Sequence, residues 1–517
     1  MVFGILYLMT KHSTYLWWGA LFLIVLIFAS LRLPSIYYRE VAYTYDQARD
    51  FLAGARMVTD HQLTFIGPTT GIGGLFHGVW WYYFTAFTFL ISHNPITVYV
   101  AVFLVQLISL IVGMIVVRRL LGSPASLIFG MIVSTGSYFI RTSTFVGNNI
   151  MAMPSYLTYI LSLSYLILNQ PKGRNRLIAL AIFGLSAGFV AEFELAFGLF
   201  LLPVTLLICI FTPLRRLLNT RLSFAVYFAS VVFPFIPRIL FEIKNHFIQT
   251  KVLLEFFTKP KYYTVEPFQE IWNKRISTYI TYLNDSFTST FFLALFALCV
   301  TVAIILWVFK RRQFSNQRAI VLLLTLIALH ITLFILTFTY KDTFWSYYYE
   351  GIQYGILVTG LVGVSLLLQF TSSKIVFLPI TLSFIAYLFM SMPHAVNSWD
   401  SRTVLSGLKV QEAVIDEIVA QEKGKNEGIF CAKVYVPAVI PYTYDYLWLY
   451  HYLKRTIETP RDTFQRGYCW YIIEPDAKEF AYRIAAWKLK YIPANAKIKP
   501  QETKIINGIE ISKYYLE

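Results

Sequence analysis

Three charged side chains stand close together in the segment Tyr43–Asp50, directly after the first apolar stretch of the chain. If a helix begins at Asp46, then Arg49 and Asp50 lie three and four positions later on the same face, and two carboxylates share one patch with a guanidinium group. A carboxylate there can take a proton from an attacking hydroxyl group, and the guanidinium can stabilise a developing negative charge. The structural alternative is that Asp46 caps the helix and the other two residues form its solvated side.

The rest of the sequence predicts the membrane helices that must position this patch. Of the 517 residues, 57% are hydrophobic, 18% are aromatic and only 14% are charged. Apolar runs of roughly 17 to 25 residues recur, and each is long enough to cross a bilayer. We therefore predict a mainly α, polytopic membrane helix bundle of about 11 spans, near residues 15–33, 96–117, 124–141, 154–170, 177–193, 195–212, 222–238, 288–309, 318–339, 347–369 and 374–391.

The basic residues predict how the chain is oriented. The formal net charge of +16 could indicate nucleic-acid binding, but the Lys and Arg residues fall in short clusters between apolar runs, so we exclude that partner. With the N-terminus in the cytoplasm, every cluster lies on the cytoplasmic side: Arg118–Arg119, residues 172–176, 215–221 and 310–318, and Lys374. An odd number of spans then places the C-terminus on the outer side of the cytoplasmic (inner) membrane.

The aromatic run Gly74–Ile91 is ambiguous, because it could be counted as one more span. Counting it would place most of the basic clusters outside, so we predict an interfacial helix, where Trp and Tyr rings are favoured. Residues 1–394 are thus predicted to form the transmembrane domain, with a first extracytoplasmic loop at residues 34–95 and a second large one at residues 239–287.

Beyond residue 394 the composition becomes that of a soluble domain. Helix-like segments (410–422, 444–454 and 479–490) alternate with strand-like segments (428–436 and 468–473), which predicts a small extracytoplasmic α/β domain over residues 395–517. Cys431 and Cys469 lie in the two predicted strands and could pair in an oxidising compartment.

The first loop resembles that of a known enzyme family. An acidic residue after the first span, an Arg three positions later, a Gly-Pro pair and an aromatic interfacial helix are similar to the first loop of GT-C glycosyltransferases. The likeness is to the branch with protein O-mannosyltransferases, aminoarabinose transferases of lipid A and RgtA/B/C/D-like transferases, and it covers roughly residues 1–395 in topology. The run Pro234–Asn245 also resembles one found in bacterial members.

The resemblance implies that Asp46 is the catalytic aspartate and that Arg49 is the arginine near it. Two departures stand out: Gln47 follows Asp46 where the family often has Glu, and His77-Gly78-Val79 replaces a Lys-Pro-Pro or His-Pro-Pro element. The first change removes one metal ligand or second acid, and the second leaves open which cation binds phosphate. No cofactor is certain, and a divalent metal stays an open alternative.

Further residues could line the substrate sites, and each has a structural alternative. Glu192 and Glu194 lie at the turn between two spans and point in different directions, so at most one should face a central cavity, where it could bind metal or a substrate amine. The other candidates for substrate binding, besides Arg49, are Asp50, His77, Arg141, Asn149, Lys259, Lys261 and Tyr348. Helix capping, snorkelling, contacts with lipid headgroups and the aromatic belt would explain the same residues without a substrate.

These features favour an integral-membrane glycosyltransferase that moves a sugar from a polyprenyl-phosphate carrier to an extracytoplasmic acceptor, which is a lipid, a glycan or a protein. Asp46 would be the general base, and direct displacement would invert the anomeric configuration. A transporter or flippase of lipid-linked saccharides is the alternative, because many spans and basic external loops would suit it too. A third reading is a transferase-like scaffold that has lost activity, with the external domain as its working part.

Overall fold

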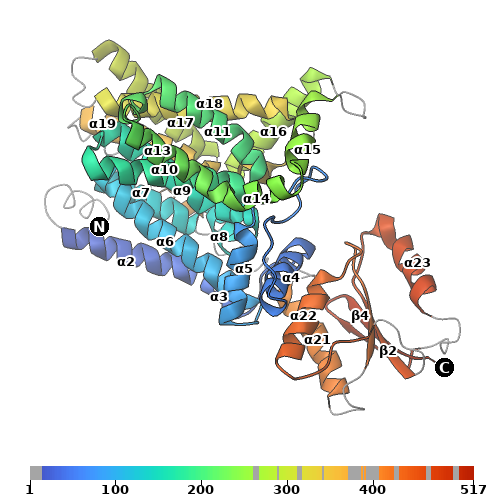
Figure 1. The fold of residues 1–517 in the computed structure, drawn as a ribbon. Helices are drawn as coiled ribbons and strands as arrows, with labels where there is room; N and C mark the ends of the chain where they lie inside the picture. The colour runs from blue at the N-terminus through green and yellow to red at the C-terminus, as the bar shows by residue number, and fades with distance from the viewer. Residues whose placement is uncertain are drawn as a thin grey trace.

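The computed structural model describes residues 14–259, 267–287, 290–310, 317–340, 343–370, 383, 386–387, 389–391, 407–423, 430–461, 467–492 and 500–516. It has two parts: a bundle of long helices and, at one end of that bundle, a smaller domain with a sheet (Figure 1). The boundary predicted at residue 394 lies outside the described residues.

The long helices of the bundle are mostly apolar on every side, which is the pattern of helices buried in lipid or protein. The helices of the bundle are α2 (Thr14–Ser30), α6 (Ile96–Leu121), α7 (Ser123–Thr135), α8 (Ser137–Ser143), α9 (Asn148–Asn169), α10 (Gly173–Phe193), α11 (Leu195–Phe211), α12 (Leu214–Leu217), α13 (Arg221–Val232), η1 (Phe233–Phe235), α14 (Ile236–Lys244), α17 (Thr290–Lys310), α18 (Gln317–Leu336), η3 (Thr337–Thr339) and α19 (Ile352–Phe370). The short helices α12 and α14 differ from the long ones, because they carry charged residues. Outside the apolar bundle, α15 (Ile248–Thr258), α16 (Phe268–Ser286) and η4 (Ser346–Tyr349) connect its later helices.

Among the described residues, seven helices are long and apolar enough to cross a membrane, or eight if the bent pair α7–α8 forms one span. The two helices of that pair meet at 63°, where the backbone of Gly136 is extended. Helix α11 and residues Ile352–Leu368 of α19 are shorter apolar helices. The predicted class, a multi-helix membrane bundle, is confirmed. The count of about 11 spans is not confirmed by the described residues, and the span predicted near 374–391 lies largely outside them.

A buried arginine fixes the place where the first loop leaves the bundle. Arg32 follows α2 and is fully buried, and its guanidinium donates to the carbonyls of Val133 and Ser134 in α7 at 2.9 and 2.8 Å. Its Nε donates to Ser143 Oγ at 2.5 Å, and its guanidinium carbon lies 3.6 Å from the ring centre of Phe28. Because a buried cation is costly unless its donors are satisfied, these bonds hold the end of α2 against α7 and α8.

The first loop contains three helices: α3 (Leu33–Tyr37), α4 (Tyr45–Thr59) and α5 (Trp80–Ile91). Helix α5 has 12 residues, which at 1.5 Å per residue gives about 18 Å, too short for a hydrocarbon core of about 30 Å. In Figure 1 it runs across the direction of α2 and packs beside α4. Residues 74–91 were predicted to contain a helix that does not cross the membrane as an additional span, and this arrangement agrees with that prediction.

The C-terminal domain is built on a four-stranded sheet of order β1-β2-β4-β3, in which β1 and β2 are parallel and the other neighbours are antiparallel. Its elements are α21 (Leu408–Glu422), β1 (Cys431–Tyr435), α22 (Tyr442–Leu453), β2 (Gly467–Ile473), η6 (Lys478–Phe480), α23 (Ala481–Tyr491), β3 (Glu502–Ile506) and β4 (Ile509–Leu516). Cys431 and Cys469 are register partners on β1 and β2 and form a disulfide, so the pairing considered from the sequence is present. The hairpin β3–β4 was not predicted.

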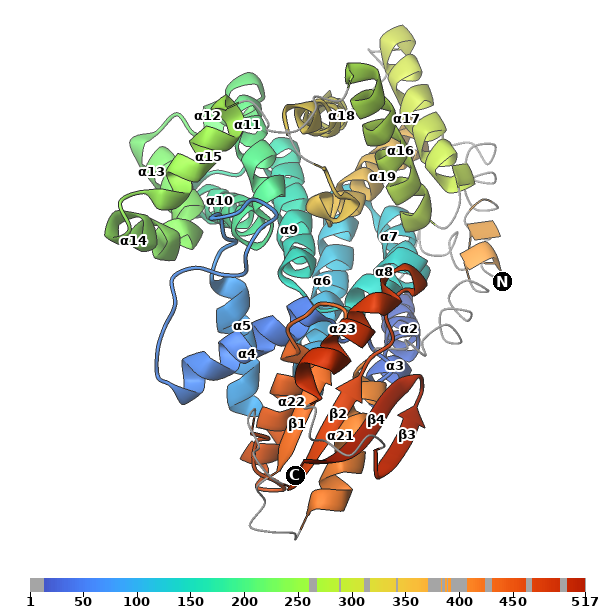
Figure 2. The same ribbon diagram turned by 90° about the vertical axis from the view of Figure 1, so that its right-hand side faces the viewer.

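The domain is docked on the first loop, next to α4 (Figures 1 and 2). The ring of Tyr446 in α22 packs edge-on against Phe51 in α4 at 5.6 Å, and its hydroxyl donates to the carbonyl of His93 at 3.0 Å. An ion pair joins Arg39, just before α4, to Glu412 in α21. The sheet domain therefore braces the helix that carries Asp46.

Candidate active site

The start of α4 is held by a buried glutamine. The backbone N–H of Thr44, the residue before the helix, donates to Gln47 Oε1 at 2.7 Å, which is one half of a capping box. The other end of the same amide, Gln47 Nε2, donates to the carbonyl of Val146 at 3.0 Å. A glutamate could accept the first bond and could not donate the second, so the departure from the family's usual Glu has a structural cause here.

The predicted patch is present on α4. Arg49 Nη1 lies 2.8 Å from Asp46 Oδ1, and Nη2 lies 2.7 Å from Asp50 Oδ1, so one guanidinium bridges both carboxylates. Asp50 also accepts a bond of 2.9 Å from Trp81 Nε1 in α5. The two carboxylates differ in exposure, since the side chain of Asp46 is 71% exposed and that of Asp50 is 3% exposed.

Because they differ in exposure, the two carboxylates are suited to different chemical roles. Burial raises the pKa of Asp50 to about 6, while the opposite charge of Arg49 and the Trp81 hydrogen bond oppose the shift. Asp50 is enclosed and anchors Arg49, whereas Asp46 is open to an incoming molecule. The structural alternative, in which Asp46 caps the helix and Arg49 and Asp50 form its solvated side, does not fit the buried Asp50, and the residue at the cap position is Thr44.

His77 is buried and lies within electrostatic reach of two arginines. Its Nδ1 accepts from the backbone N–H of Leu195 at 3.4 Å, which places the ring proton on Nε2. Burial and the positive charges of Arg238 and Arg49 lower the pKa of His77 to about 3. His77 is therefore a neutral donor, and the cationic groups that act on it are Arg238 and Arg49.

The residue after His77 must be glycine because the chain passes very close to α10. Gly78 N donates to the backbone carbonyl of Glu192 at 2.7 Å, and a Cβ at Gly78 would lie 2.1 Å from Glu192 Oε2. Proline at this position would have neither the N–H nor the space. The second departure from the family pattern follows from this contact.

Arg238 in α14 is a functional candidate that the sequence analysis did not single out. Its Nε donates to Glu192 Oε1 at 2.7 Å, and its Nη1 donates to the carbonyl of Phe76 at 2.8 Å and to Gln249 Oε1 at 3.1 Å. Glu192 was considered as a metal ligand, and in the structure its partner is this guanidinium. A cation within a predicted apolar span was the signal that could have identified Arg238.

A cavity of about 180 Å³ begins at Arg238. Its walls combine that guanidinium, Glu242, Gln249 and Thr250 with apolar side chains such as Leu199. Within the described part of the chain, Arg238 Nη2 and Gln249 Nε2 are buried donors with no hydrogen-bond acceptor. Buried donors without partners are costly, so an anionic group bound in this cavity would satisfy them.

A second, smaller pocket is lined by His77. Glu194, in the turn between α10 and α11, lines it together with Tyr340 and Tyr348. Glu194 is 2% exposed, and Tyr348 is buried as well. Tyr348 and His77, both named from the sequence as candidates for substrate binding, line the same pocket.

The remaining candidates lie in less enclosed places. Arg141 is exposed on α8, and Asn149 is half-buried in the first turn of α9. Lys259 is exposed at the end of α15 and pairs with Glu255 at 2.9 Å, and Lys261 lies outside the described residues.

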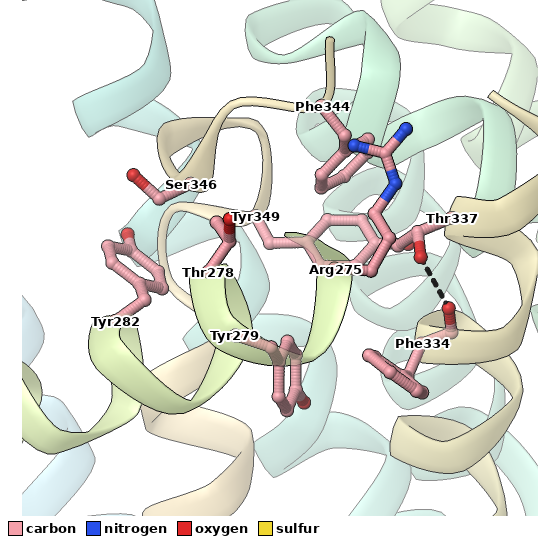
Figure 3. A pocket seen from close by; sticks show the side chains of 9 residues that line it. All are labelled: Arg275, Thr278, Tyr279, Tyr282, Phe334, Thr337, Phe344, Ser346 and Tyr349. Carbon is pink, nitrogen blue, oxygen red and sulfur yellow. Dashed lines mark hydrogen bonds between the residues drawn. The ribbon is translucent and has the colours of Figure 1, made fainter. Parts of the chain in front are cut away.

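A further apolar pocket lies beside α16 (Figure 3). The picture shows side chains of α16 facing the segment that contains Phe344 and Tyr349. Near it, the hydroxyls of Tyr282 and Tyr138 donate to Glu350 at 2.7 and 2.8 Å. The lining residues of this pocket do not include the α4 patch.

Comparison with known proteins addresses the fold. No protein-family profile matches the chain, and no curated protein matches it. Among solved structures, ArnT from Cupriavidus metallidurans bound to undecaprenyl phosphate superposes with a TM-score of 0.54 at 11% identity, over 96% of this chain and 97% of ArnT. The chain has the GT-C fold. The oligosaccharyltransferase of Archaeoglobus fulgidus in its apo form shares this fold, with a TM-score of 0.51 at 12% identity, over 87% of this chain and 64% of that one.

Proposed function

We propose that this GT-C protein transfers a sugar from a polyprenyl-phosphate carrier to an acceptor on the outer face of the cytoplasmic membrane. The observation that carries the proposal is the apolar cavity of about 180 Å³ that ends at the unsatisfied donors of Arg238 and Gln249. A lipid phosphate matches both features, because its tail is apolar and its headgroup accepts hydrogen bonds. ArnT, a structural neighbour, binds undecaprenyl phosphate, which belongs to the same chemical class.

The arrangement of charges supports a direct displacement. An acceptor hydroxyl oxygen attacks the anomeric carbon, the bond from that carbon to the phosphate oxygen breaks, and the electron pair leaves with the phosphate. Asp46 takes the hydroxyl proton, because its carboxylate is open to an acceptor. The departing phosphate is stabilised by Arg238, by Arg49 and by the Nε2–H of His77, which is within electrostatic reach of both cations.

Two features support the outer face as the place of reaction. The basic clusters of the short loops favour a cytoplasmic position for the opposite ends of the helices. The Cys431–Cys469 disulfide, in the domain that braces α4, favours an oxidising compartment for that domain. The acceptor, which is a lipid, glycan or protein, would then approach Asp46 from outside.

The experiment uses the full-length protein in lipid nanodiscs with synthetic undecaprenyl-phosphate hexose labelled in the sugar. With an extract of membrane lipids, glycans and proteins as acceptor, we expect wild-type protein to move label from the carrier to another molecule. Asp46→Asn should slow this transfer by about 10²- to 10⁴-fold, which is the usual contribution of a general base, with undecaprenyl phosphate bound as tightly as before.

Asp60→Asn is the matched control, because Asp60 is exposed at the opposite end of the same helix. Unchanged transfer by Asp46→Asn would remove the assignment of the base. Label that crosses the membrane of a proteoliposome and stays on the carrier, in wild type and Asp46→Asn alike, would instead identify a flippase.

A further inference from the structure

The C-terminal domain places a tyrosine ring beside the charged patch of α4. Helix α22 lies next to α4 (Figures 1 and 2). The ring of Tyr442, the first residue of α22, packs against the ring of Tyr45, the first residue of α4, with centres 4.9 Å apart and planes at 46°. Tyr45 directly precedes Asp46 and shares a helix face with Arg49, four positions later. The domain therefore adds a side chain to the surroundings of the proposed base, besides bracing its helix.

The hydroxyl groups of three tyrosines gather around Arg49. The hydroxyl of Tyr45 lies within electrostatic reach of Arg49 and Asp46, and it is close enough to the hydroxyl of Tyr442 to share a hydrogen bond. Tyr82 in α5 has its hydroxyl beside the same guanidinium and within reach of Tyr442. All three tyrosines are partly exposed. A molecule that approaches Asp46 thus meets phenol groups, which both donate and accept hydrogen bonds.

The turn that leads into α22 has a strained backbone. Val439 has a φ of 73°, in the left-handed region that a β-branched residue rarely adopts. The turn is held by short-range bonds, since Val439 N donates to the carbonyl of Val436 at 2.9 Å and Tyr442 N donates to the carbonyl of Ile440 at 3.0 Å. Strained backbone persists only where its surroundings hold it, and it is concentrated at functional sites. This turn fixes the start of α22 and hence the position of Tyr442.

Further aromatic rings near Asp46 are open to solvent. Tyr347 lies within electrostatic reach of Asp46 and is 43% exposed. Its ring is stacked on that of Trp345, which is 52% exposed, at an angle of 12°. The C–H groups of a sugar ring pack favourably on the electron-rich faces of aromatic rings, and sugar hydroxyls can bond to phenol groups. Aromatic faces mixed with hydroxyls suit a carbohydrate better than a lipid tail, which would need a continuous apolar surface.

The charge of the patch bears on the kind of carbohydrate. Asp46 and Asp50 share the one guanidinium of Arg49, so two carboxylates and one cation leave this patch with a net negative charge at pH 7. An acceptor that carries a phosphate or a carboxylate would be repelled there, because like charges brought together cost free energy. The patch therefore favours an acceptor without charge.

We propose that Tyr442 and Tyr45 form the acceptor site and that the acceptor is an uncharged carbohydrate. One sugar ring of the acceptor packs against the tyrosine pair, and one of its hydroxyl groups points to Asp46. Tyr442 binds the acceptor and takes no part in proton transfer, so the C-terminal domain helps to select the acceptor. This assignment rests on the function proposed above.

The test applies the full-length protein in labelled lipid nanodiscs to an array of neutral, amino and acidic oligosaccharides and of peptides that contain Ser and Thr. Wild type is compared with Tyr442→Phe, Tyr442→Ala and the control Tyr482→Ala, an exposed tyrosine of α23. Phenylalanine keeps the ring that packs on Tyr45 and loses only the hydroxyl, so this variant should stay folded. The affinity for undecaprenyl phosphate is measured in parallel, because Tyr442 does not line the cavity at Arg238.

Wild type should bind neutral oligosaccharides in preference to acidic ones and to peptides. Tyr442→Phe should weaken this binding about threefold to tenfold through the lost hydrogen bond, and Tyr442→Ala should weaken it more than about tenfold through the lost ring. Both variants should bind undecaprenyl phosphate as wild type does, and Tyr482→Ala should match wild type in every assay. In transfer to the best-bound oligosaccharide, Tyr442→Phe should raise the KM of the acceptor and leave kcat nearly unchanged, whereas a purely structural role would lower kcat.

Three results would overturn the assignment: no binding of neutral oligosaccharides by wild type, a preference for acidic oligosaccharides or peptides, or unchanged binding in both Tyr442 variants. Binding that follows the expected pattern, without any transfer of label by wild type, would contradict the transfer reaction and would leave the acceptor site supported.

Discussion

The buried carboxylate of Asp50 should give the protein a pH dependence that can be traced to one residue. Burial raises its pKa to about 6, and the charged groups that face it are Arg49 and Asp46, with the indole N–H of Trp81 as a further donor. Below pH 6 Asp50 becomes protonated, Arg49 loses its charged partner, and the guanidinium is no longer held beside Asp46. At pH 5 about one tenth of the protein would keep the ionised form, so kcat/KM for transfer should fall about tenfold from its value at pH 7.

The effect on stability has the opposite sign, which separates this mechanism from acid unfolding. The pKa of Asp50 is higher in the folded protein than its usual value of 3.8, so the folded state binds the proton more tightly and gains stability as the pH falls. The shift of about 2 units corresponds to about 3 kcal/mol in full, and about 1.4 kcal/mol of it should be present at pH 5.

Asp50→Asn is the decisive variant for this pH dependence, because asparagine keeps the shape and an acceptor for Trp81. The variant should be less active at pH 7 and should lack both the loss of activity near pH 6 and the gain in thermal stability between pH 7 and 5. Asp60→Asn should behave as wild type. An Asp50→Asn profile that still falls with a midpoint near pH 6 would refute the reasoning, since another group would then be titrating.

Three further predictions concern the parts that hold the site. Gly78→Ala should lower the free energy of unfolding by about 1–3 kcal/mol, measured as a lower melting temperature, because the new Cβ would lie 2.1 Å from Glu192 Oε2. Gly19→Ala is the control, since a Cβ at Gly19 has no heavy atom within 4 Å, and it should be neutral or slightly stabilising. Cys431→Ala should cost about 4 kcal/mol in unfolding of the C-terminal domain, as expected for a disulfide that closes a separation of 38 residues, and a reducing agent should reproduce the loss in wild type but not in the variant. Tyr446→Ala should increase the protease sensitivity of the junction between the C-terminal domain and α4, and it should lower kcat more than it raises KM. A variant that raises KM and leaves kcat unchanged would argue against a bracing role for the domain.

The local features of the fold and of the site could be predicted from the sequence. The spacing of Asp46, Arg49 and Asp50 predicts a shared helix face, and the structure has it, because that relation depends only on the helical repeat. The helices of the C-terminal domain were also predicted within a few residues. The strands β3 and β4 were missed, since β3 is mostly exposed and its polar sequence lacks an apolar alternation.

Relations between distant segments could not be predicted in this way. The sequence does not show that Asp50 is buried, because the indole that covers it comes from α5, 31 residues later. Arg238 and Glu192 are 46 residues apart, and their pairing depends on how α10 packs against α13 and η1, which directly precede α14. The small pocket lined by Glu194 likewise needs three separate segments of the chain, so it could not be predicted from the sequence.

The two carboxylates bound to Arg49 suggest how one helix can supply both a fixed and a reactive acid. Asp50 is enclosed by α5 and accepts hydrogen bonds from both Nε and Nη2 of the guanidinium, so it is suited to positioning. Asp46 receives only one bond from the same guanidinium and faces outward, so an acceptor hydroxyl can replace solvent on its free oxygen. Pairs of acids whose surroundings differ in this way commonly divide their roles in catalysis. The two asparagine variants should therefore differ: Asp46→Asn should slow transfer by about 10²- to 10⁴-fold at every pH, whereas Asp50→Asn should leave a less impaired reaction that no longer responds to pH near 6.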